Sequence, residues 1–137
     1  MRLAVFQPDI PGNLGSIFRT MACFSGAVYV IGPRGFPISE KALHGAGMDY
    51  TDHVEIRFHD DWAAFQAVAH ERLVLMTTQG ATPLHSFRFE RGDTLLLGRE
   101  SAGVPQEVHD AADARVLIPM RPGLRSLNVA VSAGIAA

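Results

Sequence analysis

Polar and basic side chains gather near the end of this 137-residue sequence. The stretch "LIPMRPGLRSLNVAVSAGIAA" (117–137) runs from an apolar segment, through a Pro/Gly loop, into a run of small apolar residues typical of a helix. The loop holds Arg121, Arg125, Ser126 and Asn128. Guanidinium groups bind phosphate oxygens in paired hydrogen bonds, and a hydroxyl or an amide can orient a polar substrate. Taken alone, Ser126 or Asn128 is equally well explained as the cap of the last helix.

Two earlier loops also carry residues that could do chemistry. "GRESAGVP" (98–105) follows four apolar residues and places Glu100 between Gly98 and Gly103. Glycine lets the backbone approach a ligand closely, although a plain turn explains the same composition. "NLGSIFR" (13–19) begins with Asn13, which we expect to cap a helix. Arg19 lies about 600° further round that helix, so the two residues do not share a face, and Arg19 by itself is typical of an amphipathic surface.

Several common sites are excluded by spacing. Val104 follows Gly103 where a phosphate-binding loop needs Lys, and the sequence has neither a dinucleotide fingerprint nor the nucleophile turn of serine hydrolases. The six histidines show no HxxxH or HExxH spacing, so we expect no metal site.

Composition places the chain among ordinary globular proteins, with 47% hydrophobic and 19% charged residues, and we expect one domain over 1–137. Cys23 is the single cysteine, which excludes an intramolecular disulfide and favours a cytoplasmic location. No apolar run approaches the ~20 residues of a membrane-spanning helix. The net charge of −2 argues weakly against nucleic-acid binding, but eleven of the twelve basic residues are arginines, and several occur in expected loops.

Apolar runs and helical periods alternate along the chain. The expected strands are 2–6, 27–32, 53–58, 72–78, 94–98 and 115–119. The expected helices are 13–25, 39–47, 60–70, 105–114 and 127–137. This alternation predicts an α/β fold with a mostly parallel sheet and helices on both faces. Ligands of such folds bind at the carboxyl ends of the strands, where the three loops above should lie.

The three loops, in this order and spacing, closely resemble the motifs of the SPOUT class of RNA methyltransferases. "FQPDIPGNLGSIFR", "ISEKALHGAGMDY" and "LMTTQGATPLHS" extend the resemblance over essentially the whole chain. The most similar members are single-domain enzymes that 2′-O-methylate the wobble nucleotide of tRNA, cytidine or uridine 34. The resemblance implies a deep C-terminal trefoil knot that forms a pocket for S-adenosylmethionine, with S-adenosylhomocysteine as product and no metal. It also implies that the chain ends inside the last helix of the family.

Site residues follow from the same resemblance, position by position. Cofactor contacts fall on Met76, Thr77, Gly98, Ile118, Met120 and Ser126. The polar residues that arrange catalysis are Asn13, Arg19, Glu100, Ser126 and Asn128. Because a guanidinium stays protonated, electrostatic stabilisation suits Arg19 better than a role as base.

The resemblance also implies a homodimer that acts on tRNA. Candidate phosphate contacts are Arg34, Arg99, Arg121 and Arg125. Two alternatives remain open: methylation of another RNA such as rRNA, and a knotted binding module without activity.

Overall fold

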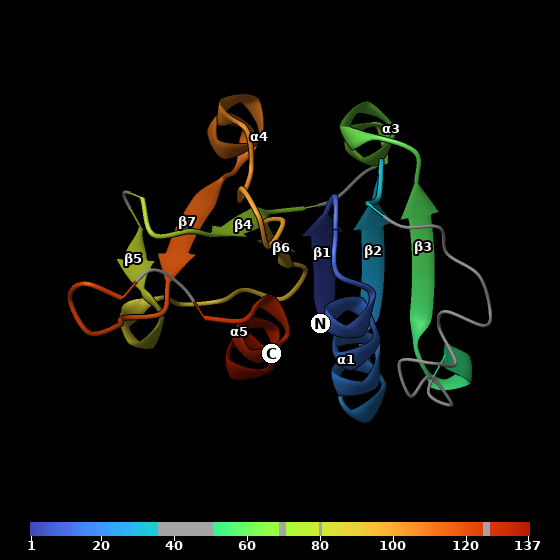
Figure 1. Ribbon diagram of the computed structural model, residues 1–137, viewed down its shortest axis with the longest axis horizontal. Helices are drawn as coiled ribbons and strands as arrows, with labels where there is room; N and C mark the ends of the chain where they lie inside the picture. Colours follow the sequence, from blue (N-terminus) through green and yellow to red (C-terminus); the bar gives the residue numbers. More distant parts are fainter. Residues whose placement is uncertain (36–50, 69–70, 80, 125–126) are drawn as a thin grey trace.

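The computed structural model describes residues 1–35, 51–68, 71–79, 81–124 and 127–137. The strands are β1 (Arg2–Phe6), β2 (Ala27–Ile31), β3 (Glu55–His59), β4 (Leu73–Met76), β5 (Thr82–Pro83), β6 (Thr94–Leu97) and β7 (Ala114–Leu117). The α-helices are α1 (Pro11–Cys23), α3 (Trp62–Ala67), α4 (Gln106–Ala111) and α5 (Val129–Ala136). Two short 3₁₀ helices, η1 (Thr51–His53) and η2 (Leu84–Ser86), complete the set (Figure 1).

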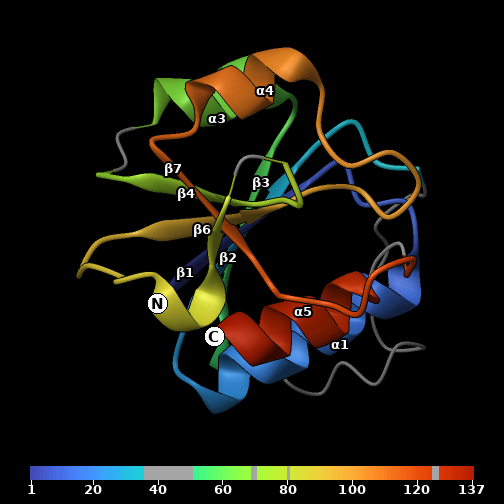
Figure 2. The same ribbon diagram turned by 90° about the vertical axis from the view of Figure 1, so that its left-hand side faces the viewer.

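The strands form one parallel sheet in the order β3-β2-β1-β6-β4-β7-β5. Helices α1 and α5 lie together on one face, and α3 and α4 cover the other (Figure 2). The predicted α/β class, with a parallel sheet between two helical layers, is therefore confirmed.

Alternate residues of the central strands pack into two hydrophobic cores, one on each face of the sheet. In β1, Leu3 and Val5 pack in the core beneath α1 and α5, whereas Ala4 and Phe6 belong to the core on the opposite face. In β6, Leu95 and Leu97 again face the first core and Leu96 the second. Each fully buried side chain of this size contributes about 1.5–3 kcal/mol, so the sheet positions the loops at its carboxyl edge rigidly.

The first helix starts earlier than predicted, and the prediction that Asn13 caps it is wrong. Ile10 is the N-cap and Pro11 opens α1. Proline fits the first turn because it has no N–H to leave unpaired and its φ is already helical. Asn13 therefore lies inside the helix, and its side chain is available for other contacts. The predicted helix 39–47 lies outside the described residues.

Other elements also differ from the sequence prediction, and α4 ends at Ala111, where the helix was expected to reach residue 114. Helix α3 covers only Trp62–Ala67, where 60–70 was expected, with Asp61 as its cap: the carboxylate accepts from the Ala64 N–H at 2.8 Å. Strand β3 begins at Glu55 because η1 occupies 51–53. The two-residue strand β5 lies in a segment where no strand was expected, because only its pairing with β7 makes it a strand.

The path of the chain near the C-terminus is unusual. Strand β7 lies between β4 and β5, although both precede it in the sequence. The chain then leaves β7 and forms α5 against α1. Strand β6 likewise lies between the earlier strands β1 and β4, so the strand order is compatible with a knot but does not require one. The deep trefoil knot itself stays a prediction from the family resemblance.

Candidate functional site

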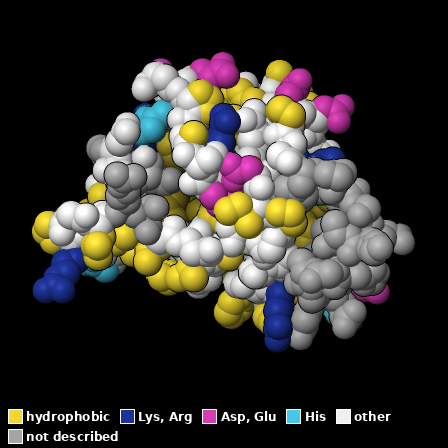
Figure 3. Space-filling model, in the orientation of Figure 1, with side chains coloured by type: hydrophobic (Ala, Val, Ile, Leu, Met, Phe, Trp, Pro, Cys, Tyr) yellow, Lys and Arg dark blue, Asp and Glu magenta, His cyan; other side chains and the backbone are white. Residues whose placement is uncertain are grey.

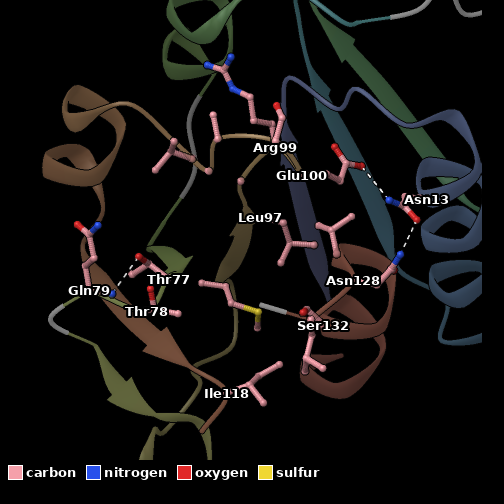
Figure 4. Close-up of a pocket in the computed structure, with 18 of the residues that line it drawn as sticks. Asn13, Thr77, Thr78, Gln79, Leu97, Arg99, Glu100, Ile118, Asn128 and Ser132 are labelled. Atoms are coloured by element: carbon pink, nitrogen blue, oxygen red, sulfur yellow. Dashed lines mark hydrogen bonds between the residues drawn. The ribbon is translucent and has the colours of Figure 1, made fainter. Parts of the chain in front are cut away.

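A cavity of about 570 Å³ opens at the carboxyl ends of β4, β6 and β7 (Figure 4). Loops that follow these strands supply its walls, as expected for a parallel α/β sheet. The lining includes every described residue that the resemblance assigns to the cofactor, namely Met76, Thr77, Gly98, Ile118 and Met120. Ser126 lies outside the described residues.

The Gly98–Gly103 loop is closed on itself by two backbone hydrogen bonds. The Arg99 N–H donates to the Gly103 carbonyl at 3.0 Å, and the Gly103 N–H donates to the Arg99 carbonyl at 2.9 Å. Gly103 has φ +62°, a left-handed conformation that favours glycine. A Cβ on Gly98 would lie 2.8 Å from the Gly103 Cα, so the close approach at Gly98 is to the other end of its own loop. Both glycines line the cavity.

A chain of polar side chains joins three elements at one edge of the cavity (Figure 4). The Asn13 amide donates to Glu100 Oε1 at 3.2 Å, and the Asn128 amide donates to Asn13 Oδ1 at 2.9 Å. Asn128 Oδ1 in turn accepts from the N–H groups of Ala130 and Val131, so Asn128, one of the two residues that the sequence offered as a cap, is the N-cap of α5. These hydrogen bonds hold the loop after β6 together with helices α1 and α5 at the site.

Asp9, in the loop after β1, extends this chain. Its backbone N–H donates to Glu100 Oε2 at 3.1 Å, and its carboxylate accepts from the Ser101 hydroxyl. Burial and the neighbouring Asp9 raise the pKa of Glu100 above its ordinary value. The pKa of Asp9 is lowered, first by the Glu100 side chain and then by Ser101. The two carboxyl groups therefore titrate as a pair.

The predicted basic residues do not converge on the cavity. Arg19 is exposed on α1 and is not part of the lining. Arg99 lines the cavity, but its guanidinium turns away from Glu100 and stacks over the Phe6 ring, 5.5 Å from the ring centre (Figure 4). Arg34 stacks in the same way on Phe58, at 5.3 Å. Arg121 is exposed, and Arg125 lies outside the described residues.

The molecular surface shows the same scattered placement of basic side chains. On the face drawn in Figure 3, Lys and Arg side chains lie apart from one another and do not form one patch.

Sequence reasoning missed Asp9 and Ser132. Ser132 is buried on α5 and lines the cavity. Asp9 could have been found, because β1 and β6 pair directly and the loops that follow neighbouring parallel strands must meet. Ser132 gave no signal in a helix of small residues, since only the packing of α5 against the site turns it inward.

The cavity suits the S-adenosylmethionine that the resemblance implies. Its volume falls within the about 300–1,000 Å³ of small-molecule sites, and its lining combines apolar and polar side chains in similar measure. Leu97, Ile118 and Val129 form apolar wall, whereas Asn13, Glu100 and Ser132 supply hydrogen-bonding groups. The tight Gly98–Gly103 turn keeps side chains out of one side, so that backbone can contact a ligand there.

The described residues include no group of three His, Cys, Asp or Glu side chains that could hold a metal ion. Among the same residues, none of the helices has the length and apolar character needed to cross a membrane.

Comparison with known proteins decides the family. The profile of the SpoU rRNA Methylase family matches residues 1–137. This chain belongs to that family. A tRNA (cytidine(34)-2'-O)-methyltransferase from Beijerinckia indica is 50% identical over 136 residues, which cover 97% of this chain and 85% of the relative. The protein of the same name from Escherichia coli K12 is 37% identical over 94% of this chain and 84% of its own length.

Solved structures of SpoU-type enzymes share the fold. One, concerned with the 2-OH methylation of C/U34 on tRNA, superposes with a TM-score of 0.91 and 41% identity, over 98% of this chain and 90% of that chain. An AdoMet-bound rRNA methyltransferase from Sinorhizobium meliloti gives 0.87 and 27%, but this chain spans only 53% of it.

Proposed function

We propose that this SpoU-family chain transfers a methyl group from S-adenosylmethionine to the ribose 2′-hydroxyl of cytidine or uridine 34 in tRNA. The observation that carries the proposal is the cavity at the strand ends, with the Glu100–Asn13–Asn128 chain along its edge. Relatives of that activity cover nearly the whole chain, at up to 50% identity.

The residues divide into a binding group and a reacting group. Met76, Thr77, Gly98, Ile118, Met120 and Ser126 hold the cofactor. When bound, S-adenosylmethionine supplies an electrophilic methyl group on a sulfonium, which removes the need for a metal. Glu100, Asn13 and Asn128, with Ser126, orient the ribose by hydrogen bonds.

Arg19 acts on the nucleotide from outside the cavity. The guanidinium stays charged, so it stabilises the 2′-oxygen as its proton leaves to solvent water and the methyl group is taken up, and it holds the adjacent phosphate. Its exposure on α1 leaves it accessible to an RNA chain that lies across the mouth of the site. Arg34, Arg99, Arg121 and Arg125 are the candidate phosphate contacts around it.

A homodimer is also part of the proposal. Val131 and Ile135 lie one turn apart on α5 and are half exposed, and Leu127, which precedes the helix, extends this apolar stripe. A second copy of the chain would cover this stripe. Sedimentation equilibrium of Ile135→Lys should show monomer, whereas Phe24→Lys, which changes an exposed apolar residue outside the stripe, should keep the wild-type state. Identical behaviour of the two variants would remove α5 from the interface.

Single-turnover methyl transfer tests the reaction itself. Purified protein, S-adenosylmethionine and tRNA transcript in EDTA should give one ribose methylation at position 34. A transcript with a 2′-deoxynucleotide at position 34 should accept none. Transfer to that control, or to an rRNA fragment instead of tRNA, would favour the alternative substrates.

A further inference from the structure

Two carboxyl groups from separate loops meet at the edge of the cavity. Asp9 follows β1 and Glu100 follows β6, and these strands are neighbours in the sheet. The Asp9 N–H donates to Glu100 Oε2 at 3.1 Å, and the two carboxyl groups lie near enough that each shifts the pKa of the other. Two carboxylates in contact cannot both be charged cheaply, because like charges in a partly desolvated site repel strongly.

Three of the four carboxyl oxygens of Asp9 and Glu100 accept a hydrogen bond, and the fourth has no donor among the described residues. Glu100 Oε1 accepts from Asn13 and Glu100 Oε2 from the Asp9 backbone, while Asp9 Oδ2 accepts from the Ser101 hydroxyl at 2.5 Å. Asp9 Oδ1 is buried and accepts from no donor among the described residues. A buried acceptor without a donor is costly, and a protonated carboxyl group is a donor. A proton on Glu100 would therefore satisfy the one oxygen that lacks a partner.

The directions of the two pKa shifts agree with this reading. Burial and Asp9 raise the pKa of Glu100, whereas the Glu100 side chain and Ser101 lower the pKa of Asp9. Opposite shifts are expected when one carboxyl group keeps a proton and donates it to the other.

We propose that Glu100 and Asp9 share one proton, which Glu100 carries and Asp9 accepts, and that Asp9 is the positioning residue for the polar chain at the site. Its catalytic consequence rests on the proposed function above. The position of Glu100 affects α5 through two amide side chains, because Asn13 donates to Glu100 and accepts from Asn128, which caps α5. Loss of the Asp9 carboxyl group would leave Glu100 ionised and held only by Asn13 and the backbone N–H of residue 9, which would loosen the amides beyond it.

Among the described residues, the elements next to the pair carry few other charged groups; one is Arg34, which precedes the Gly35 that packs against Asp9. Arg19 is the only charged residue of α1, and α5 has none. Arg99, next to Glu100 in the sequence, directs its guanidinium onto Phe6. The shifts of both pKa values arise from Asp9, Glu100, Ser101, Asn13 and burial.

The test combines a titration with kinetics on the full chain. Carboxyl-carbon NMR should show Glu100 of the wild type titrating above 4.5, and its pKa should fall in both Asp9→Ala and Asp9→Asn, because the neighbouring charge is gone. Single-turnover methyl transfer should fall by about tenfold or more in Asp9→Ala, the factor that about 1.4 kcal/mol of barrier represents. Asp9→Asn should recover most of the rate, since its amide can donate to ionised Glu100. Asp60→Asn, an exposed aspartate away from the site, should change neither the titration nor the rate.

Each outcome tests a separate part of the proposal. Ordinary titration of Glu100 in the wild type, or no change in either Asp9 variant, would overturn the shared proton. A rate for Asp9→Asn as low as that for Asp9→Ala would overturn the positioning role, because it would require the charge of Asp9. Ser101→Ala gives a check that leaves Asp9 in place: loss of its hydrogen bond should raise the pKa of Asp9. A wild type that shows the raised Glu100 pKa but does not methylate position 34 would refute the proposed function and leave the shared proton standing.

Discussion

Replacement of Gly98 by alanine should weaken cofactor binding through the closed loop. The added Cβ would lie 2.8 Å from both the Cα and the carbonyl carbon of Gly103, closer than real Cβ contacts allow. Because both atoms belong to backbone, the loop must open and lose its two Arg99–Gly103 hydrogen bonds. At about 0.5–1.5 kcal/mol each, that loss amounts to about 1–3 kcal/mol. If the cofactor binds only the closed loop, its dissociation constant should rise by about 5- to 150-fold.

Calorimetry with S-adenosylmethionine measures this effect, and thermal unfolding shows whether the fold survives. Gly12→Ala is the matched control, because a Cβ at Gly12 meets nothing within 4 Å and Gly12 does not line the cavity. We expect Gly12→Ala to bind as the wild type does. Gly98→Ala with a dissociation constant within about twofold of the wild type would refute the argument that the loop must stay closed.

Four further variants test the remaining assignments. Arg19→Ala should keep cofactor affinity near wild type while single-turnover transfer falls by about 10²–10³; a rate within threefold would remove Arg19 from the mechanism. Asn128→Ala should cost about 1 kcal/mol of stability through loss of the α5 cap. Asn128→Asp keeps the capping oxygen but loses the donor to Asn13, so methyl transfer should slow with little change in the unfolding midpoint. Equal unfolding midpoints for the two variants would contradict the capping role of Asn128. The Arg72 guanidinium holds the pKa of Asp93 below its ordinary 3.8, so this carboxylate stabilises the fold above that pH and the stabilisation is lost as pH falls through the lowered pKa. Asp93→Asn should therefore unfold at a lower temperature at pH 7, with the difference from wild type shrinking below pH 3.8; a constant difference would contradict the pairing.

The sequence predicted the layers well because hydrophobic patterning is local. The apolar runs at 27–32 and 94–98 correspond to β2 and β6, each within one residue at its end. Helix starts were less accurate, since Asn13 looks like a cap until Pro11 is recognised as the first helical residue. Strand β5 could not be predicted from its own two residues, because only the insertion of β7 beside it makes it a strand.

The candidate site was predictable as a set of loops but not as a network. Each loop had a structural explanation by itself, and only their order and spacing pointed to one site. The contacts from Glu100 to Asn13 and from Asn13 to Asn128 join residues 87 and 115 positions apart, which no local pattern encodes. The resemblance assigned Arg19 to catalysis, but the structure places it outside the cavity wall, so its role depends on how RNA approaches α1.

Mass spectrometry of tRNA nucleosides tests the central claim most directly. Cells that lack this protein should lose 2′-O-methylcytidine or 2′-O-methyluridine at tRNA position 34, and expression of the wild-type chain, but not of Arg19→Ala, should restore it. Unchanged methylation of position 34, together with loss of a ribose-methylated nucleoside from rRNA, would contradict the account.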